Sequence, residues 1–193
     1  MAKTLEELNA DIAGLVTFLP DEDKLCLSEY AAKVPDGGKI VEIGTADGGS
    51  AVIMAVSSKP SVKLWTIDPT ESLKFKNKLA VLGLSNRVTY LQGKSEDLVS
   101  QWSGDEIDLL FIDGMHGYEA VARDISLWGK YVKEDGYVLI HDTLYYEDTV
   151  GLAARDAIGS GLLKKEKLLE DDIYTKTGLA VGMLITRKEK WPT

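Results

Sequence analysis

Polar side chains that could bind or transform a small molecule follow five apolar runs of the sequence, at the point where each run ends. They are Glu42 and Gly44, Asp68, Ser95, Asp113 with His116, and His141 with Asp142. If the five runs are parallel strands of one sheet, their carboxyl ends meet along one crevice, and these residues become neighbours in space. The spacing therefore predicts a single small-molecule site.

A glycine-rich segment at residues 42–49 reads Glu-Ile-Gly-Thr-Ala-Asp-Gly-Gly and separates an apolar run from a small-and-apolar stretch that starts at Ser50. A strand, a glycine loop and a helix in this order form the ligand-binding end of many open α/β sheets. Ala46 departs from the Gly-x-Gly-x-x-Gly pattern at the middle glycine, where a pyrophosphate needs close approach of the backbone. The loop therefore disfavours a dinucleotide.

Three side chains around this loop each have more than one interpretation. Asp68 lies 24 residues after Gly44, where a carboxylate can accept hydrogen bonds from both hydroxyls of a ribose or simply form a turn. Glu42, near the end of an apolar run, needs a partner if it is buried, such as backbone amides or a ligand ammonium. Ser50 either begins the helix or donates to a ligand carboxylate beside the helix N-terminus.

The aspartates that end the fourth and fifth runs could hold a cation. Asp113 and Asp142 would repel one another unless a cation lay between them, and with Thr143 and water they offer the hard oxygen ligands that Mg²⁺, Mn²⁺ or Ca²⁺ prefer. The alternative is an aspartate turn and a helix cap. His141 is a metal ligand, a group behind the ligands, or a strand-end histidine with ordinary hydrogen bonds. An unperturbed histidine has a pKa of about 6.5, which suits a general base, so His116 is either a general base or an exposed loop histidine.

The elements that must position these residues follow from hydrophobic periodicity and turn residues. Helical spacing predicts helices over residues 4–18, 22–33, 50–56, 71–82, 118–131 and 148–158, with a short helix ending near 102. Apolar runs predict strands over 40–43, 62–67, 88–92, 107–112 and 137–140. Two further strand candidates, 167–174 and 179–186, flank a short Lys176-Thr-Gly178 turn that suits an antiparallel hairpin.

This order of elements predicts the α/β class. We expect a doubly wound, Rossmann-like, seven-stranded sheet, mostly parallel with an antiparallel C-terminal hairpin. We also expect a single domain over residues 1–193, with N-terminal helices in 1–35 and the sheet core in 36–193.

Composition excludes several classes of protein. The net charge of -9 argues against a nucleic-acid-binding surface, which would be basic. Cys26 is the single cysteine, so neither an internal disulfide nor a multi-cysteine metal site can form. We find no signal peptide and no apolar run of the ~18 residues that a membrane span needs. We therefore expect a cytoplasmic protein that binds neither nucleic acid nor membrane.

Together the motifs resemble the class I S-adenosylmethionine-dependent methyltransferases, and within them the metal-dependent O-methyltransferases of the catechol and caffeoyl-CoA type. The resemblance rests on Val41-Glu-Ile-Gly-Thr-Ala-Asp-Gly-Gly-Ser-Ala-Val52 and covers about residues 38–145. It implies that Asp113 and Asp142 hold a divalent cation, with Mg²⁺ expected first and Mn²⁺ or Ca²⁺ as alternatives. It also implies that S-adenosylmethionine is bound by Glu42, Gly44, Thr45, Gly48, Ser50, Asp68, Ser95 and Asp113.

Two positions depart from the catechol-type pattern. Those enzymes have a lysine base three residues after the first metal aspartate, whereas this chain has His116, which is similar to the macrocin and mycinamicin sugar O-methyltransferases. The third metal position, usually asparagine, is Thr143, with His141 on the other side of Asp142. The resemblance implies in-line methyl transfer to a small-molecule hydroxyl, of a catechol-like group or vicinal diol, with His116 taking the proton.

Two other functions stay open. An NAD(P)-dependent oxidoreductase is disfavoured by Ala46 and by the C-terminal hairpin. A cofactor-binding protein without transferase activity would have no use for Asp113, His116 and Asp142. A homodimer could form through the N-terminal helices or the hairpin. No motif identifies the methyl acceptor, although four aromatic side chains lie near the site loops in sequence: Trp102, Tyr118, Tyr145 and Tyr146.

Overall fold

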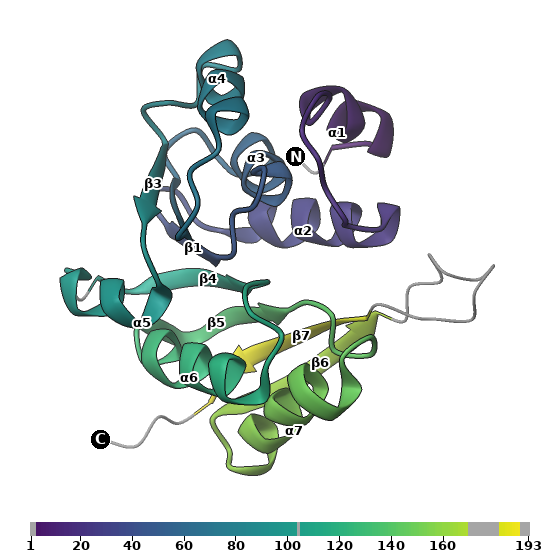
Figure 1. Ribbon diagram of the computed structural model, residues 1–193, viewed down its shortest axis with the longest axis vertical. Coiled ribbons are helices and arrows are strands. Elements are labelled where there is room, and N and C mark those ends of the chain that lie inside the picture. Colours follow the sequence, from purple (N-terminus) through teal and green to yellow (C-terminus); the bar gives the residue numbers. More distant parts are fainter. Residues whose placement is uncertain (1–2, 104, 170–181, 190–193) are drawn as a thin grey trace.

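In the computed structural model, the described residues are 3–103, 105–169 and 182–189. Seven strands of this part of the chain form one sheet in the order β3-β2-β1-β4-β5-β7-β6 (Figure 1). The predicted α/β class with a mostly parallel sheet is confirmed. The strands are β1 Lys39–Ile43, β2 Lys63–Asp68, β3 Val88–Gln92, β4 Ile107–Ile112, β5 Val132–Ile140, β6 Leu163–Leu169 and β7 Met183–Lys188.

The order of the strands reverses at the centre of the sheet. The strand β1 pairs in parallel with β2 on one side and with β4 on the other. The outer pairs β2–β3 and β4–β5 are also parallel, whereas β7 is antiparallel to both β5 and β6. In such sheets a crevice forms outside the carboxyl ends of the strands where the order reverses, so β1 and β4 define where a ligand site should lie.

Alternation of side chains along the strands creates two apolar cores, one on each face of the sheet. On β4, Leu109 and Phe111 are buried in one core, and Leu110 and Ile112 are buried in the other. The first core is covered by α1 (Leu5–Asp11), α2 (Asp21–Lys33), α3 (Gly49–Ser57) and α4 (Leu73–Val81). The second is covered by α6 (Tyr118–Gly129) and α7 (Leu152–Gly159) (Figure 1).

Three short helical turns complete the connections between these elements. They are α5 (Ser95–Leu98), the 3-10 turn η1 (Val99–Gln101) and the π-helical turn η2 (Glu147–Gly151). Within the described residues, no helix has the length and the apolar character that crossing a membrane requires.

The first helix is shorter than the periodicity predicts. It begins as expected, because the Thr4 hydroxyl accepts a hydrogen bond from the Glu7 backbone N–H and the Glu7 carboxylate accepts one from the Thr4 N–H at 2.8 Å. It ends at Asp11 rather than near residue 18, and Gly14 then takes a φ of +88°. The residues predicted as its last turns instead form a loop, which lines the cavity described below.

The C-terminal strands form the predicted antiparallel pair, but at other residues. The strand β6 spans 163–169 rather than 167–174, and β7 spans 183–188 rather than 179–186. The charged run Lys164-Lys-Glu-Lys167 has no strand-like apolar pattern, yet it is compatible with a sheet edge, where one face is solvated. The predicted turn at 176–178 lies outside the described residues.

Candidate functional site

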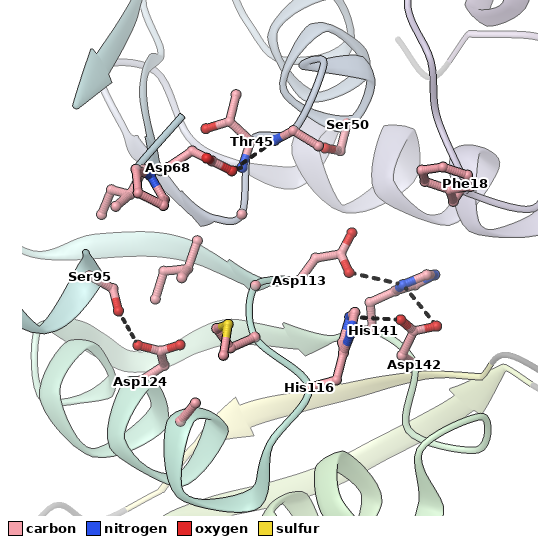
Figure 2. Close-up of a pocket in the computed structure, with 18 of the residues that line it drawn as sticks. Phe18, Thr45, Ser50, Asp68, Ser95, Asp113, His116, Asp124, His141 and Asp142 are labelled. Carbon is pink, nitrogen blue, oxygen red and sulfur yellow. Dashed lines mark hydrogen bonds and ion pairs between the residues drawn. The ribbon is translucent and has the colours of Figure 1, made fainter. Parts of the chain in front are cut away.

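A cavity of about 810 Å³ opens at the carboxyl ends of the central strands, within the ~300–1,000 Å³ typical of small-ligand sites. Its walls come from the glycine loop after β1, the ends of β2 and β3, the loops after β4 and β5, and the segment 16–19 before α2 (Figure 2). The expected convergence of strand ends is therefore present. The predicted residues that line the cavity are Gly44, Thr45, Ser50, Asp68, Ser95, Asp113, His116, His141 and Asp142.

The glycine loop passes the loop after β4 at backbone contact distance. A Cβ atom added to Gly44 would lie 2.1 Å from the carbonyl oxygen of Asp113, and the Gly44 φ of +98° is itself unfavourable for other residues. Any side chain at this position would therefore push the two loops apart. Glycine here lets the two loops pack backbone against backbone at the cavity wall.

Asp68, at the end of β2, holds the glycine loop in place. Its Oδ2 atom accepts hydrogen bonds from the backbone N–H groups of Thr45 at 3.1 Å and Ala46 at 3.0 Å (Figure 2). Its Oδ1 atom accepts one from Thr70 N–H at 2.8 Å. Because a carboxylate offers about four lone-pair positions, Asp68 has room for about one further donor rather than for two ribose hydroxyls.

Glu42 lies beneath the loop and does not reach the cavity. Its side chain is fully buried and accepts hydrogen bonds from the Ser50 and Thr66 hydroxyls. Burial raises the pKa of this carboxyl from its usual 4.5 to about 8, although the two hydrogen bonds lower it. The predicted need for a partner is thus met by two hydroxyls, and one of them belongs to Ser50 at the cavity wall.

Ser95 connects the β3 end of the cavity to α6. Its hydroxyl donates to Asp124 Oδ1, and its carbonyl oxygen accepts a hydrogen bond from Trp128 Nε1 at 3.2 Å (Figure 2). Burial raises the pKa of the Asp124 carboxyl to about 6, and the Ser95 hydrogen bond opposes this rise. Sequence reasoning missed Asp124, because it is an ordinary polar position in a helical pattern.

The acid cluster at the ends of β4 and β5 is centred on His141. The His141 Nδ1 atom lies 3.2 Å from Asp113 Oδ1 and 3.5 Å from Asp142 Oδ1 (Figure 2). Burial favours the neutral ring, but the charge of Asp113 and the hydrogen bonds of the surrounding carboxylates raise the pKa of His141 well above its ordinary value. The three ligand atoms lie within 4.8 Å of one another, which is compact enough to surround one cation.

A third carboxylate reaches this cluster from the N-terminal part of the chain. Asp23, in the first turn of α2, places Oδ2 2.8 Å from His141 Nε2, and its side chain is fully buried. Sequence reasoning missed it, because acidic residues in a first helical turn are usual for exposed helix starts. Its spacing could have indicated its burial, because Asp23 lies on the same side of α2 as the apolar residues Leu27 and Tyr30, which are buried.

His116 lies at the cavity wall between Asp142 and an aromatic ring. Its Nε2 atom is 3.0 Å from Asp142 Oδ2, and its ring stacks on that of Tyr146 with 4.4 Å between centroids. The hydrogen bond to Asp142 raises the pKa of the His116 ring despite its partial burial. Burial alone would raise the pKa of Asp142, but the hydrogen bonds from both histidines hold it well below its usual range.

Apolar side chains surround the mouth of the cavity near His116. Phe18 is 82% exposed and Met115 is 75% exposed although both line the cavity, as do Tyr145 and Tyr146. Exposed large apolar groups around a concave site favour a ligand with an apolar or aromatic surface. Two of the aromatic candidates from the sequence lie elsewhere. Trp102 packs edge-to-face on Trp65 and Trp128, and the Tyr118 hydroxyl donates to Asp156.

Three predicted site residues are not brought to the cavity wall. Glu42 is held below it, as described. Gly48 has a φ of +83° at the start of α3, and a Cβ atom there would lie 2.1 Å from the Phe75 ring, so this glycine is needed for packing. Thr143 is buried and its hydroxyl donates to the Gly182 carbonyl at 3.3 Å, which directs it away from Asp113 and Asp142.

Comparison with known proteins identifies the family. A family described as a methyltransferase domain matches residues 41–143, more than half of the chain. An uncharacterized protein of Acanthamoeba polyphaga mimivirus is 34% identical over 127 residues, which cover 56% of this chain and 51% of that protein. The chain therefore spans about half the length of this relative.

Solved structures agree with the family match. The O-methyltransferase TomG from Streptomyces achromogenes, in complex with SAM, has a TM-score of 0.77 at 16% identity, covering 98% of this chain and 92% of that chain. An O-methyltransferase from Bacillus cereus, in complex with SAH, has a TM-score of 0.75 at 14% identity, covering 96% and 90%. At these identities the likeness shows the fold. Together with the family match, it confirms the class I methyltransferase part of the resemblance: this chain belongs to the methyltransferase-domain family and has the class I methyltransferase fold.

Proposed function

We propose that this protein transfers a methyl group from S-adenosylmethionine to a hydroxyl oxygen of a small molecule that carries a catechol-like group or a vicinal diol. The observation that supports this most directly is that one cavity is lined both by the glycine loop and by His116 beside Asp142. A cofactor site and a general base therefore face the same space. The family match supports the transferase activity, and the exposed apolar rim supports an aromatic acceptor.

The cofactor would lie along the glycine loop. When bound, S-adenosylmethionine supplies a methyl group on a positively charged sulfur, which is already a good electrophile. The chain's own residues would orient it: Gly44 keeps the backbone close, Asp68 has room for a ribose hydroxyl, and Ser95 lies at the β3 end of the cavity, where we propose that the adenine binds. Ser50 gives its hydroxyl hydrogen to Glu42, so its oxygen can only accept from a ligand while that bond persists.

His116 would take the proton from the acceptor hydroxyl. If its Nε2–H donates to Asp142, the Nδ1 atom keeps a lone pair for an incoming proton. Asp142 then stabilises the imidazolium that forms, which is why its hydrogen bond raises the pKa of His116. Tyr146 holds the plane of the ring by stacking.

A divalent cation would be held by Asp113, His141 and Asp142. The carboxylates of Asp23, Asp113 and Asp142 contact the rings of His116 or His141. Even if both rings are protonated, this cluster keeps one formal negative charge, which a cation would offset. The sequence predicts Mg²⁺, with Mn²⁺ or Ca²⁺ as alternatives, and Thr143 as the third ligand. In the structure the Thr143 hydroxyl bonds elsewhere, and His141 is the third group close to Asp113 and Asp142. When bound, such a cation supplies Lewis acidity that lowers the pKa of a coordinated hydroxyl.

The remaining parts of the proposal concern partners and location. The net charge of -9 supports a small-molecule acceptor over a nucleic acid. A cytoplasmic location and a homodimer stay predictions, which fractionation and sedimentation would check.

Calorimetry and turnover with a matched variant test the function. We expect S-adenosylhomocysteine and S-adenosylmethionine to bind and NAD⁺ not to bind; the reverse result would favour an oxidoreductase. With a panel of catechols and sugar diols, Mg²⁺ or Mn²⁺ and labelled cofactor, His116→Ala should lose methyl transfer by at least ~100-fold while its S-adenosylhomocysteine affinity stays within about twofold. Equal turnover by the variant would remove His116 from the mechanism. Cofactor binding without turnover of any acceptor would favour a binding protein.

A further inference from the structure

Resting on the proposed function, we propose that Asp23 is a positioning residue that fixes His141 as a nitrogen donor, and that the site therefore binds Mn²⁺ more tightly than Mg²⁺. Four side chains form this cluster: Asp23, His141 and the Asp113–Asp142 pair on the other side of the ring. Figure 2 shows Asp113 and Asp142 directed toward the same ring of His141.

Asp23 is more deeply buried than a helix start requires. Its side chain is fully buried, and its Oδ1 atom has no hydrogen-bond partner among the described residues. The neighbouring Asp21 already places an exposed carboxylate in the first turn of α2, where it pairs with Lys24. Burying a second carboxylate there is costly. Within the part of the chain that the structure describes, the one polar contact of its side chain is the 2.8 Å approach to His141 Nε2, and this contact accounts for the burial.

The contact with Asp23 decides which nitrogen of His141 faces the cavity with a lone pair. A neutral ring that donates its Nε2–H to Asp23 keeps the lone pair of Nδ1, and Nδ1 is the atom near Asp113 and Asp142. A bound cation would take the place of the Nδ1 proton. A carboxylate behind a histidine is the usual arrangement in metal sites, where it fixes the tautomer and makes the ring a stronger donor.

The distances around Nδ1 favour a cation over a shared proton. Charge-assisted N–H···O bonds are about 2.7–2.9 Å long. The Nδ1 atom lies 3.2 Å from Asp113 Oδ1, a long hydrogen bond, and 3.5 Å from Asp142 Oδ1, so both contacts exceed this length. Adjacent ligands of a six-coordinate cation with ~2.1–2.2 Å bonds lie about 3 Å apart, which is closer to what the cluster has.

The nitrogen donor determines the preferred cation. Mg²⁺ selects oxygen ligands and keeps much of its water, whereas the first-row transition ions also take imidazole nitrogen. Within that class Mn²⁺ binds most weakly and shares with Mg²⁺ the preference for carboxylates, so it is the ion that the nitrogen must separate from Mg²⁺. A site with two carboxylates and one imidazole has oxygen for either ion, but its nitrogen adds affinity only for the second class. We therefore expect Mn²⁺ to bind at least ~10-fold more tightly than Mg²⁺.

Electron paramagnetic resonance of free Mn²⁺ tests this without any methyl acceptor. The protein is titrated with Mn²⁺ alone, and bound Mn²⁺ is then competed with Mg²⁺. We expect the preference for Mn²⁺ in the wild type and a clear reduction of it in His141→Asp, which replaces the nitrogen by oxygen. Asp23→Asn should weaken Mn²⁺ binding by ~10–100-fold while S-adenosylhomocysteine affinity is kept. Asp21→Asn, an exposed change on the same helix, should alter neither.

Each contrary result overturns a stated part of the inference. Equal or tighter binding of Mg²⁺ by the wild type removes the selectivity, and an unchanged Mn²⁺ affinity in Asp23→Asn removes the positioning role. A parallel loss of metal and S-adenosylhomocysteine affinity in that variant makes Asp23 merely structural. If Asp23→Asn does not fold, the wild-type competition and His141→Asp still decide the selectivity. No binding of either ion removes the metal from the proposed function too, whereas retained S-adenosylhomocysteine binding leaves the transferase itself standing.

Discussion

Replacing Glu42 by glutamine tests the electrostatics beneath the glycine loop. Burial raises the pKa of the Glu42 carboxyl from 4.5 to about 8, against the hydrogen bonds from Ser50 and Thr66. A carboxyl with the higher pKa in the folded protein binds its proton more tightly there than in the unfolded chain. Between pH 4.5 and about 8, the folded state therefore loses stability as the pH rises, because it must either keep the proton or bury a charge.

The size of this effect follows from the two pKa values. Each pH unit between them costs the folded state about 1.4 kcal/mol, so the wild type should lose about 3 kcal/mol from this group between pH 5 and pH 7. Glutamine has nearly the same shape, can still accept from the Ser50 hydroxyl, and does not titrate. The free energy of unfolding of Glu42→Gln relative to the wild type should therefore rise by about 3 kcal/mol over this range.

Urea denaturation at several pH values between 5 and 8 measures this difference. Taking variant minus wild type cancels the titrations that the two proteins share, provided that both unfold in one transition. Glu29→Gln is the matched control, because Glu29 lies exposed on α2 and its change should give a nearly flat difference. A flat difference for Glu42→Gln as well would refute the raised pKa and the reasoning built on its burial.

Two further substitutions test how the loops are held. Gly44→Ala should reduce S-adenosylhomocysteine affinity by at least ~10-fold in calorimetry, because its Cβ would lie 2.1 Å from a backbone oxygen. The control is Gly83→Ala, which is also at positive φ but has open space around its Cβ. It should leave the affinity unchanged. Trp128→Phe keeps most of the buried ring but loses the Nε1–H bond to the Ser95 carbonyl, so it should cost about 1–2 kcal/mol in urea denaturation and weaken cofactor binding. A variant as stable as the wild type, with full affinity, would contradict the role given to that bond.

The strands that carry the site could be predicted because they are apolar runs that end in turn residues. The strands β3 and β4 have the predicted bounds, Val88–Gln92 and Ile107–Ile112. Because parallel strands end at the same edge of the sheet, the residues that follow them could be expected to line one cavity. The bounds of the edge strand β6 could not be predicted in this way, because its exposed charged residues hide the apolar periodicity.

The contacts across the sequence could not be predicted in the same way. Asp23 and His141 are 118 residues apart, and nothing in either local pattern indicates the other. Asp124 and Phe18 belong to a helix and a loop whose orientation toward the cavity depends on packing. The N-terminal helix α2 covers one face of the sheet and also places Asp23 against His141, which its local sequence pattern does not indicate.

Charge along the cavity wall gives a physical reason why this fold should take a sulfonium cofactor. A dinucleotide would bring an anionic pyrophosphate into the cavity, whereas S-adenosylmethionine brings a positive sulfur. Within the glycine loop, Ala46 disfavours a dinucleotide. The acidic side chains of the cavity wall act over a longer range and favour the positively charged S-adenosylmethionine. Arg123, which could attract a phosphate, is paired with Glu96. The wall carries five carboxylates, Asp68, Glu96, Asp113, Asp124 and Asp142, against Lys94, Arg123 and the two histidine rings, so acids prevail even when both rings are protonated.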